Sequence, residues 1–121
     1  MASVGAESMS TMPVADRVNF KFFEVAASGA ALRVGGRFKE MPGAEQQILT
    51  TTDGRDIVIV GQNQSFHAPG FVEVIGTKVG DAQLNGVGLV PLGEDVDVEL
   101  WDKAVHMTHL PQLRAMFQPV V

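Results

Sequence analysis

The sequence contains no cysteine, and this absence removes several kinds of chemistry at once. A chain without thiols can form no disulfide, no cysteine-ligated zinc or iron–sulfur site and no thiol nucleophile. It also has no uninterrupted run of about 18 apolar residues, the length that a membrane-spanning helix needs. The first ten residues, MASVGAESMS, lack the charged start and the apolar stretch of a signal peptide. We therefore expect an intracellular protein that does not enter a membrane.

Positive charge is also scarce. Nine Lys and Arg residues stand against 14 Asp and Glu residues, so the formal net charge is −5. Proteins that hold nucleic acid by themselves usually gather a basic surface, because phosphate contacts supply most of the non-specific affinity. This charge balance argues against tight DNA binding by the chain alone. Hydrophobic residues make up 45% of the sequence and the mean hydropathy is +0.14, which suggests that a partner covers some apolar surface.

The length of 121 residues is typical of one folded domain. We expect a small, polar, disordered tail over residues 1–11, a barrel with a short helix over residues 12–93, and a C-terminal helix over residues 94–121. No internal repeat is visible. The chain should therefore have one core and one appended helix.

The short helix should begin after Asn19, whose side-chain oxygen can cap it, and end at Gly29. Phe20, Phe23 and Ala27 would then lie on one face of this helix. Together with Phe22, the first two are expected to pack in the core and at one end of the barrel.

Five segments have the apolar alternation or the composition of strands, and turn signals separate them. They are residues 31–39, 46–52, 56–60, 71–79 and 82–92. Asp53–Gly54 is the strongest hairpin signal in the chain, and the Gly35–Gly36 pair indicates a bend where one strand serves two parts of a barrel. The pattern predicts an all-β fold with flanking helices, built on a small closed or nearly closed barrel.

The C-terminal helix should begin after Asp95 or Asp97, and its apolar residues fill about half of the helical wheel. A stripe that docks on one core needs only about 100°, so we expect two neighbours, the barrel and another chain. Pro111 either breaks the helix or opens a second short one. The apolar residues are Val98, Leu100, Trp101, Ala104, Val105, Met107 and Thr108.

The remaining residues of this helix are Glu99, Asp102, Lys103, His106 and His109. Their carboxylates and imidazoles could in principle bind one metal or act as acid and base. However, no ligand from another element is evident, and an exposed helix lacks the burial that shifts a pKa toward neutrality. We therefore expect a solvated polar face with no metal, cofactor or catalytic role.

Direct binding of single-stranded DNA is the serious functional alternative. Residues that could touch phosphates are Arg33, Arg37, Lys39, Arg55 and Lys78. The second and third expected strands carry no aromatic residue on which a base could stack, although such stacking is worth about 1–3 kcal/mol per base. Phe66 and His67 could stack on a base, but anchoring of their loop to the barrel is the favoured interpretation. We expect the basic residues to form a solvated strand face.

Four stretches together resemble one family, the small subunit of replication protein A, the heterotrimeric single-stranded-DNA-binding complex of eukaryotic replication and repair. They are RVN, VGGRF, FVEVIGTKV and ELWDKAVHMTHLPQL, which cover most of the chain in register. The resemblance implies a five-stranded OB-fold Greek-key barrel. It also implies a nuclear, non-catalytic subunit, acting in DNA replication, repair and recombination, whose C-terminal helix joins the middle and large subunits.

Carried onto this chain, the resemblance places the partner interface on Val98, Trp101, Val105 and Thr108, with Leu100, Ala104 and Met107 on adjoining rows. The wheel does not decide which row faces the barrel. Two alternatives stay open: an OB-fold module that contacts single-stranded DNA directly, and the small subunit of a telomere-capping OB complex.

Overall fold

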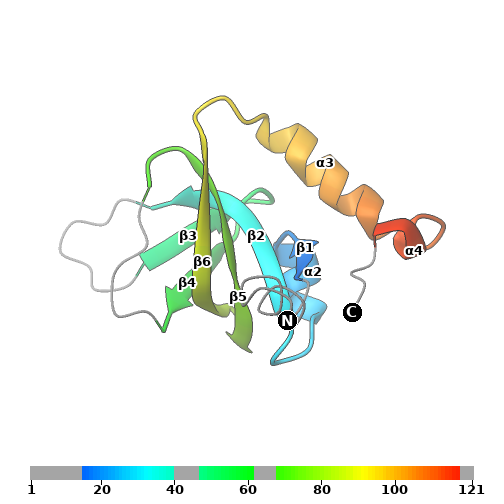
Figure 1. Cartoon of the computed structure of the whole chain (residues 1–121), viewed down its shortest axis with the longest axis horizontal. Helices are drawn as coiled ribbons and strands as arrows, with labels where there is room; N and C mark the ends of the chain where they lie inside the picture. The colour runs from blue at the N-terminus through cyan, green and yellow to red at the C-terminus, as the bar shows by residue number, and fades with distance from the viewer. Residues whose placement is uncertain (1–14, 40–46, 62–67, 118–121) are drawn as a thin grey trace, which may run out of the picture.

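A ring of five strands dominates the computed structural model, which describes residues 15–39, 47–61 and 68–117 (Figure 1). Strand β6 lies between β4 and β5, and it runs parallel to β4. Strand β2 pairs with both β3 and β5, and this double pairing closes the ring. This is the connectivity of an OB-fold, and it confirms the expected architecture. The strands are β2 (Ala31–Phe38), β3 (Gln47–Thr51), β4 (Asp56–Val60), β5 (Phe71–Gly80) and β6 (Gln83–Gly93).

The bend expected at the glycine pair is confirmed in the middle of β2. Gly36 pairs with Val72 of β5 and also with Thr51 of β3, so the strand changes partner at this residue. A Cβ on Gly36 would collide with the backbone carbonyl of Thr50. Glycine is therefore required where three strands approach one another closely.

A sixth strand, β1 (Asp16–Val18), was not expected from the sequence. It pairs in parallel with the first half of β2, so that Asp16 lies opposite Leu32 and Val18 opposite Val34. Three residues are too few to show an alternating pattern, and the partner strand follows only after an intervening helix. The pairing therefore depends on contacts that are distant in sequence.

The helix α2 (Phe20–Val25) follows directly. Asn19 caps it as expected, accepting a hydrogen bond from the Phe22 backbone N–H. The helix is shorter than expected, because it ends at Val25 rather than near Gly29. The Gly29 N–H instead donates to the backbone of β5, so the end of this segment is fixed by tertiary contact.

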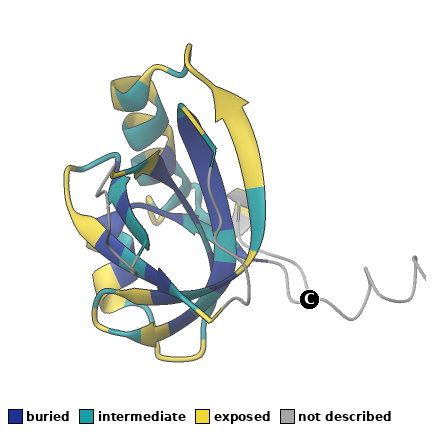
Figure 2. Ribbon diagram, turned by 90° about the vertical axis from the view of Figure 1, so that its left-hand side faces the viewer, coloured by how far each residue is buried: buried dark blue, intermediate teal, exposed yellow. Residues whose placement is uncertain are grey.

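The interior of the ring is filled by side chains from all five ring strands together with β1 and α2. Buried residues are coloured dark blue along the ribbon in Figure 2. The expected Asp53–Gly54 turn joins β3 to β4, with Gly54 at positive φ. The C-terminal end of β6, residues 90–93, is exposed (Figure 2). The buried core residues are Val18, Phe20, Phe23, Leu32, Val34, Leu49, Ile57, Ile59, Val72, Val74 and Leu84.

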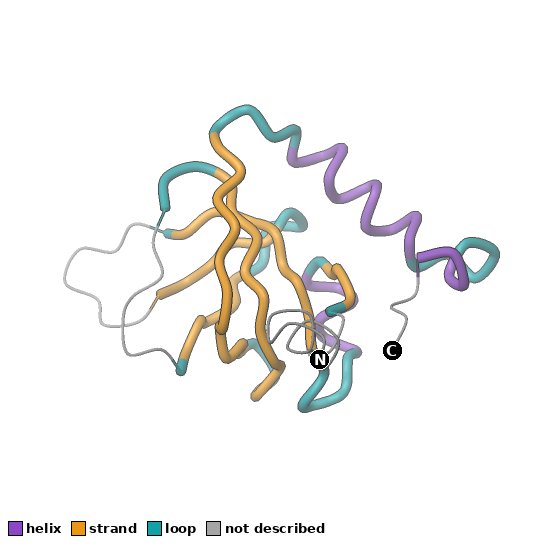
Figure 3. The backbone as a smooth tube through the Cα atoms, in the orientation of Figure 1, coloured by secondary structure: helices purple, strands orange, loops and turns teal. Residues whose placement is uncertain are grey.

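Two helices follow the barrel and lie to one side of it, α3 (Val98–Thr108) and α4 (Arg114–Phe117) (Figure 3). Asp97 caps α3 by accepting a hydrogen bond from the Leu100 N–H. Pro111 lies in the break between the two helices. None of the helices in the described ranges is long and apolar enough to cross a membrane. The expected tail over residues 1–11, and Phe66 and His67, lie outside the described residues.

Candidate protein–protein interface

One face of α3 packs against the barrel. Val105 is only 1% exposed, and the half-buried Trp101 lies 4.8 Å from Phe71 between ring centroids. The indole also rests on Gly35, where an added Cβ would be 2.7 Å from Trp101 Nε1. Gly35, the first glycine of the β2 pair, thus leaves the space in which the helix docks on the barrel.

An ion pair extends this contact toward β1. Arg17 donates to both carboxylate oxygens of the buried Glu73, at 2.6 and 3.0 Å. The Arg17 guanidinium also lies 4.8 Å from the centre of the Trp101 ring, a distance suited to a cation–π contact. The Trp101 Nε1–H is buried and has no hydrogen-bond partner among the described residues. Shape and cation–π contacts therefore hold this indole.

The expectation that the polar face of α3 is solvated is wrong for Asp102. Its Oδ1 accepts hydrogen bonds from Asn19 Nδ2 at 2.9 Å and from Thr52 Oγ1 at 2.8 Å. Asn19 is 1% exposed, and its own oxygen caps α2, so the amide must direct its N–H groups toward α3. Asp102 therefore faces inward, toward the barrel.

The same expectation is wrong for His109. Its side chain is 10% exposed and stacks on Phe22 with ring centroids 3.9 Å apart. The ring Nε2–H can donate to the Arg17 carbonyl at 2.9 Å. His106 lies at the edge of the same cluster, where its Nε2 can accept from Asn19 at 3.2 Å when that nitrogen carries no proton.

Asp102, His106 and His109 thus serve to dock the helix. Glu99 and Lys103 are exposed, as expected. Within the described ranges, no three His, Asp or Glu side chains are placed to hold a metal ion.

We call Asp16, Arg17, Asn19 and Thr52 the helix seat, because each contacts the C-terminal segment. Asp16 completes the seat by accepting two hydrogen bonds from Arg114, at 2.6 and 3.1 Å. This pairing raises the pKa of Arg114 above its ordinary value. Sequence reasoning missed the seat, because only the fold brings these residues beside the helix.

The opposite face of α3 is open and apolar. Leu100 is 63% exposed and Met107 is 53% exposed, and Ala104 between them is also exposed. Successive members are three or four residues apart, so they lie on one line along the helix. We call Leu100, Ala104 and Met107 the free row.

The seven residues expected at a partner interface therefore divide into two groups. Val105 is buried within this chain, while Val98, Trp101 and Thr108 are half-buried. The free row supplies the other three. A helical wheel cannot make this division, because both groups are apolar.

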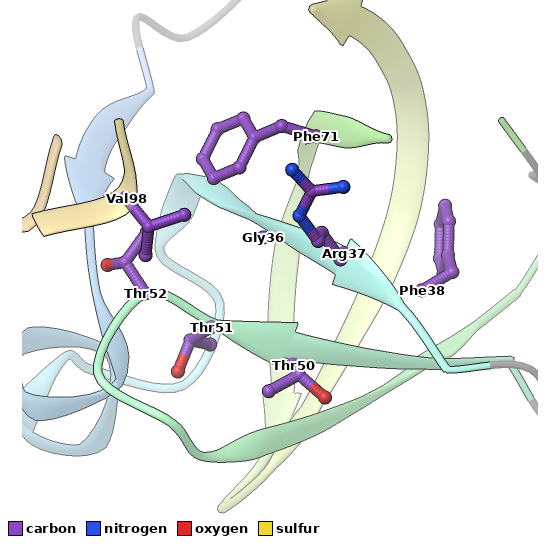
Figure 4. A pocket seen from close by; sticks show the side chains of 8 residues that line it. All are labelled: Gly36, Arg37, Phe38, Thr50, Thr51, Thr52, Phe71 and Val98. Atoms are coloured by element: carbon purple, nitrogen blue, oxygen red, sulfur yellow. The ribbon is translucent and has the colours of Figure 1, made fainter. Parts of the chain in front are cut away.

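A groove of about 270 Å³ opens where α3 begins, beside β2 and β3 (Figure 4). Its three threonine hydroxyls are engaged, since Thr50 donates to Asp56, Thr51 to Asp53 and Thr52 to Asp102. The residues that line this groove therefore do not form the set of acid, base and nucleophile that catalysis needs. The lining residues are Gly36, Arg37, Phe38, Thr50, Thr51, Thr52, Phe71 and Val98.

Lys78 does not lie on a solvated strand face, and this expectation is wrong. The residue is 6% exposed, and its Nζ donates to the carbonyls of Phe23, Glu24 and Ala26 at 2.8 to 3.0 Å. These are carbonyl groups near the C-terminal end of α2, where a cation is favoured. Lys78 therefore stabilises the fold and is not available to phosphates.

The two arginines of β2 also have partners within the chain. The half-buried Arg33 donates to the Ala15 carbonyl at 3.0 Å. Arg37 is exposed and contacts the Glu94 carboxylate at 3.4 Å, a weak pairing. Arg37 is thus the more available of the two cations.

Lys39 and Arg55 both lie at the start of β4, where Arg55 directly precedes Asp56. Lys39 Nζ is 2.6 Å from Asp56 Oδ2, and this hydrogen bond lowers the pKa of the Asp56 carboxyl. The Arg55 guanidinium lies 4.5 Å from the Phe20 ring centre. The five candidate cations therefore do not form one continuous basic row.

Comparison with known families and structures agrees with this architecture. The family model described as "Replication factor A protein 3" matches residues 9–113. No curated protein sequence matches the chain.

Three solved structures are similar to the chain. A structure of Ustilago maydis replication protein A bound to single-stranded DNA contains a chain with 21% identity and a TM-score of 0.71, covering 88% of this chain and 98% of that one. The Schizosaccharomyces pombe Stn1–Ten1 complex matches with 12% identity and a TM-score of 0.59, covering 78% and 90%. The telomere capping protein Ten1 from Schizosaccharomyces pombe matches with 12% identity and a TM-score of 0.60, covering 78% and 96%. At these identities the likeness supports the fold.

Proposed function

Because the chain belongs to the replication factor A protein 3 family, we propose that it is the non-catalytic small subunit of a heterotrimeric complex of the replication protein A type that binds single-stranded DNA. It would act in the nucleus, in DNA replication, repair and recombination. Its partners would be the middle and large subunits of that complex. The match over residues 9–113 supports this assembly over a telomere-capping one, whose small subunit shares the fold at only 12% identity.

The observation that carries the assembly role is the free row. Leu100, Ala104 and Met107 remain exposed although the opposite face of the same helix is docked. An apolar line on a surface helix is the kind of feature that packs against another helix. Trp101 and Val105 then anchor α3 to its own barrel, and the free row meets the partner subunits.

We further propose that DNA is held mainly through the complex and not by this chain alone. Lys78 is buried, and Lys39 is paired with Asp56 at 2.6 Å. The net charge of −5 opposes an electrostatic approach to phosphates. Arg37 is the candidate best placed to touch a strand that the partners already hold.

Substitution in the free row tests the assembly role. Met107→Asp should weaken binding of the full chain to the middle subunit by about tenfold or more, because burial of such a side chain supplies about 1.5–3 kcal/mol and a buried unpaired carboxylate adds a penalty. Isothermal titration calorimetry of the purified subunits measures the change. Circular dichroism should show an intact fold, since Met107 is exposed in the isolated chain.

Val87→Asp is the matched control. Val87 is 58% exposed on β6 and is also apolar, yet it lies outside α3. This variant should bind the middle subunit with unchanged affinity. Unchanged binding by Met107→Asp and Leu100→Asp would refute the proposed interface.

A further inference from the structure

The apolar residues of α3 do not by themselves fix how the helix is rotated. They fill about half of the wheel, and apolar burial has no directional preference. A rotated helix could bury Leu100 or Met107 against the barrel and expose Trp101 instead. Besides the fit of Trp101 on Gly35, directional polar contacts can select the rotation that leaves the free row open.

Asp102 supplies one directional contact. Its Oδ1 accepts from Asn19 at 2.9 Å and from Thr52 at 2.8 Å. The Asn19 amide cannot turn around without losing its hydrogen bond to the Phe22 N–H. The cap of α2 therefore fixes where the Asn19 Nδ2–H group points. This group donates its hydrogen bond to Asp102 only when the Asp102 side chain points inward.

His109 supplies a second directional contact, seven residues further along. It meets the Arg17 carbonyl at 2.9 Å and is stacked on Phe22. Seven residues are about two turns and about 10 Å of helix, so Asp102 and His109 lie within about 20° of each other on the wheel. Two such contacts on one line fix both the rotation and the axial position of the helix.

We propose that Asp102 and His109 are positioning residues of the partner surface: they dock α3 on the helix seat at the one rotation that points Leu100, Ala104 and Met107 away from the barrel. The consequence for partner binding rests on the proposed function. Buried polar contacts of this kind contribute little net stability, yet they disfavour alternative packings because a misplaced group is left without a partner.

The absence of cysteine allows a direct test of the rotation. Lys103→Cys on α3 and Val87→Cys on β6 place two spin labels at exposed positions. Double electron–electron resonance on the full chain should give one narrow distance distribution. Adding Asp102→Leu and His109→Leu should broaden or displace it, whereas Asp102→Asn with His109→Gln should restore it, because these amides keep an acceptor and a donor.

Affinity for the middle subunit is the second readout. The Leu pair should weaken binding at least tenfold, and the Asn and Gln pair should return it to within about threefold of the original. If Asp102→Leu with His109→Leu changes neither the distance distribution between the spin labels nor the affinity for the middle subunit, the proposal is overturned. A purely stabilising role would lower the melting temperature and leave the distances in folded molecules unmoved, which also contradicts it.

Two further variants keep the outcomes separable. If the Leu pair fails to fold, His109→Leu alone is measured, and it must displace the distribution for the proposal to stand. If Met107→Asp binds normally, the assembly role fails, although displaced spin labels would still support positioning by Asp102 and His109. If Met107→Asp loses binding while the Leu pair keeps it, only the positioning proposal fails.

Discussion

Single buried polar residues add hydrogen bonds between elements that are far apart in the sequence. Asn19 links α2 to α3 through one oxygen and one amide nitrogen. Lys78 links β5 to the end of α2 through three carbonyl groups. Buried polar groups are tolerated in proteins when their hydrogen bonds are made. In this chain they set where the helices attach.

Asp53 performs a similar task at the start of α2. Burial by itself would raise its pKa, but hydrogen bonds from Thr51 Oγ1 and from the backbone N–H groups of Phe20 and Lys21 outweigh it, so the pKa is held below its ordinary value. A carboxylate of this kind adds stability above its unfolded pKa of about 3.9, and the stability is lost as the pH falls through the lower folded value. The acid side of the stability profile should therefore depend on this residue.

Asp53→Asn should lower the free energy of unfolding by about 1 kcal/mol at pH 7, since it removes a carboxylate from the N-terminus of a helix. The difference from the original chain should begin to shrink below about pH 4, where Asp53 of the unfolded chain becomes protonated, and should continue to shrink until the pH passes the lower folded pKa. Urea denaturation at several pH values measures both effects. The control is Asp95→Asn, an exposed residue before α3, which should change stability by less than about 0.5 kcal/mol. A difference that stays constant down to pH 2 would contradict the assignment.

At the scale of elements, the smallest strand contacts both C-terminal helices. In β1, Asp16 pairs with Arg114. Arg17 of the same strand pairs with Glu73 and lies over the Trp101 ring. The backbone of the same strand accepts from His109. β1 therefore acts as an adaptor between the ring and α3, and its pairing with β2 places it there.

The fit of α3 on β2 can be tested at Gly35. Gly35→Ala would bring a Cβ to within 2.7 Å of Trp101 and 2.8 Å of Phe71. It should displace the indole, cost about 1–3 kcal/mol and shift the fluorescence emission of the single tryptophan to longer wavelength. Gly88→Ala is the control, because its Cβ would meet Ile75 at an ordinary 3.6 Å. An unshifted emission maximum in Gly35→Ala would show that the helix does not rest on this glycine.

At the scale of the whole molecule, the residues inside the barrel form one packed core, and α3 packs separately against the outside of the barrel. None of the residues in the described core cluster comes from α3 or α4, although Val105 is itself buried. The helix contributes its buried surface on the outside of the ring. The barrel should therefore fold without the helix, while the helix depends on the barrel.

A chain that stops after Gly93 should thus unfold cooperatively but with lower stability. Loss of the packing of Trp101 and Val105 should cost about 3–5 kcal/mol. Guanidinium denaturation followed by circular dichroism measures this, and binding to the middle subunit should be abolished. A truncated chain without a cooperative transition would show that the helix is part of the folding unit.

The sequence by itself determined the five ring strands, the Asp53–Gly54 turn, the bend at Gly35–Gly36 and the cap at Asn19, and it offered Asp95 or Asp97 as the cap of the C-terminal helix. Each of these depends on side chains or glycines within a few residues, so local patterns report them. It also indicated that α3 has more apolar surface than one neighbour can bury. These features indicated a small barrel with an appended helix that meets a partner, and the resemblance to the replication protein A small subunit implied the OB-fold.

Only the tertiary structure decided which face of α3 is free. The sequence predicted that Asp102 and His109 are solvated, because charged and polar side chains usually face water. Their partners, Asn19 and Arg17, are more than 80 residues away, and the three residues of β1 show no pattern of their own. The orientation of the helix depends on hydrogen bonds across that separation, and a helical wheel holds no information about them.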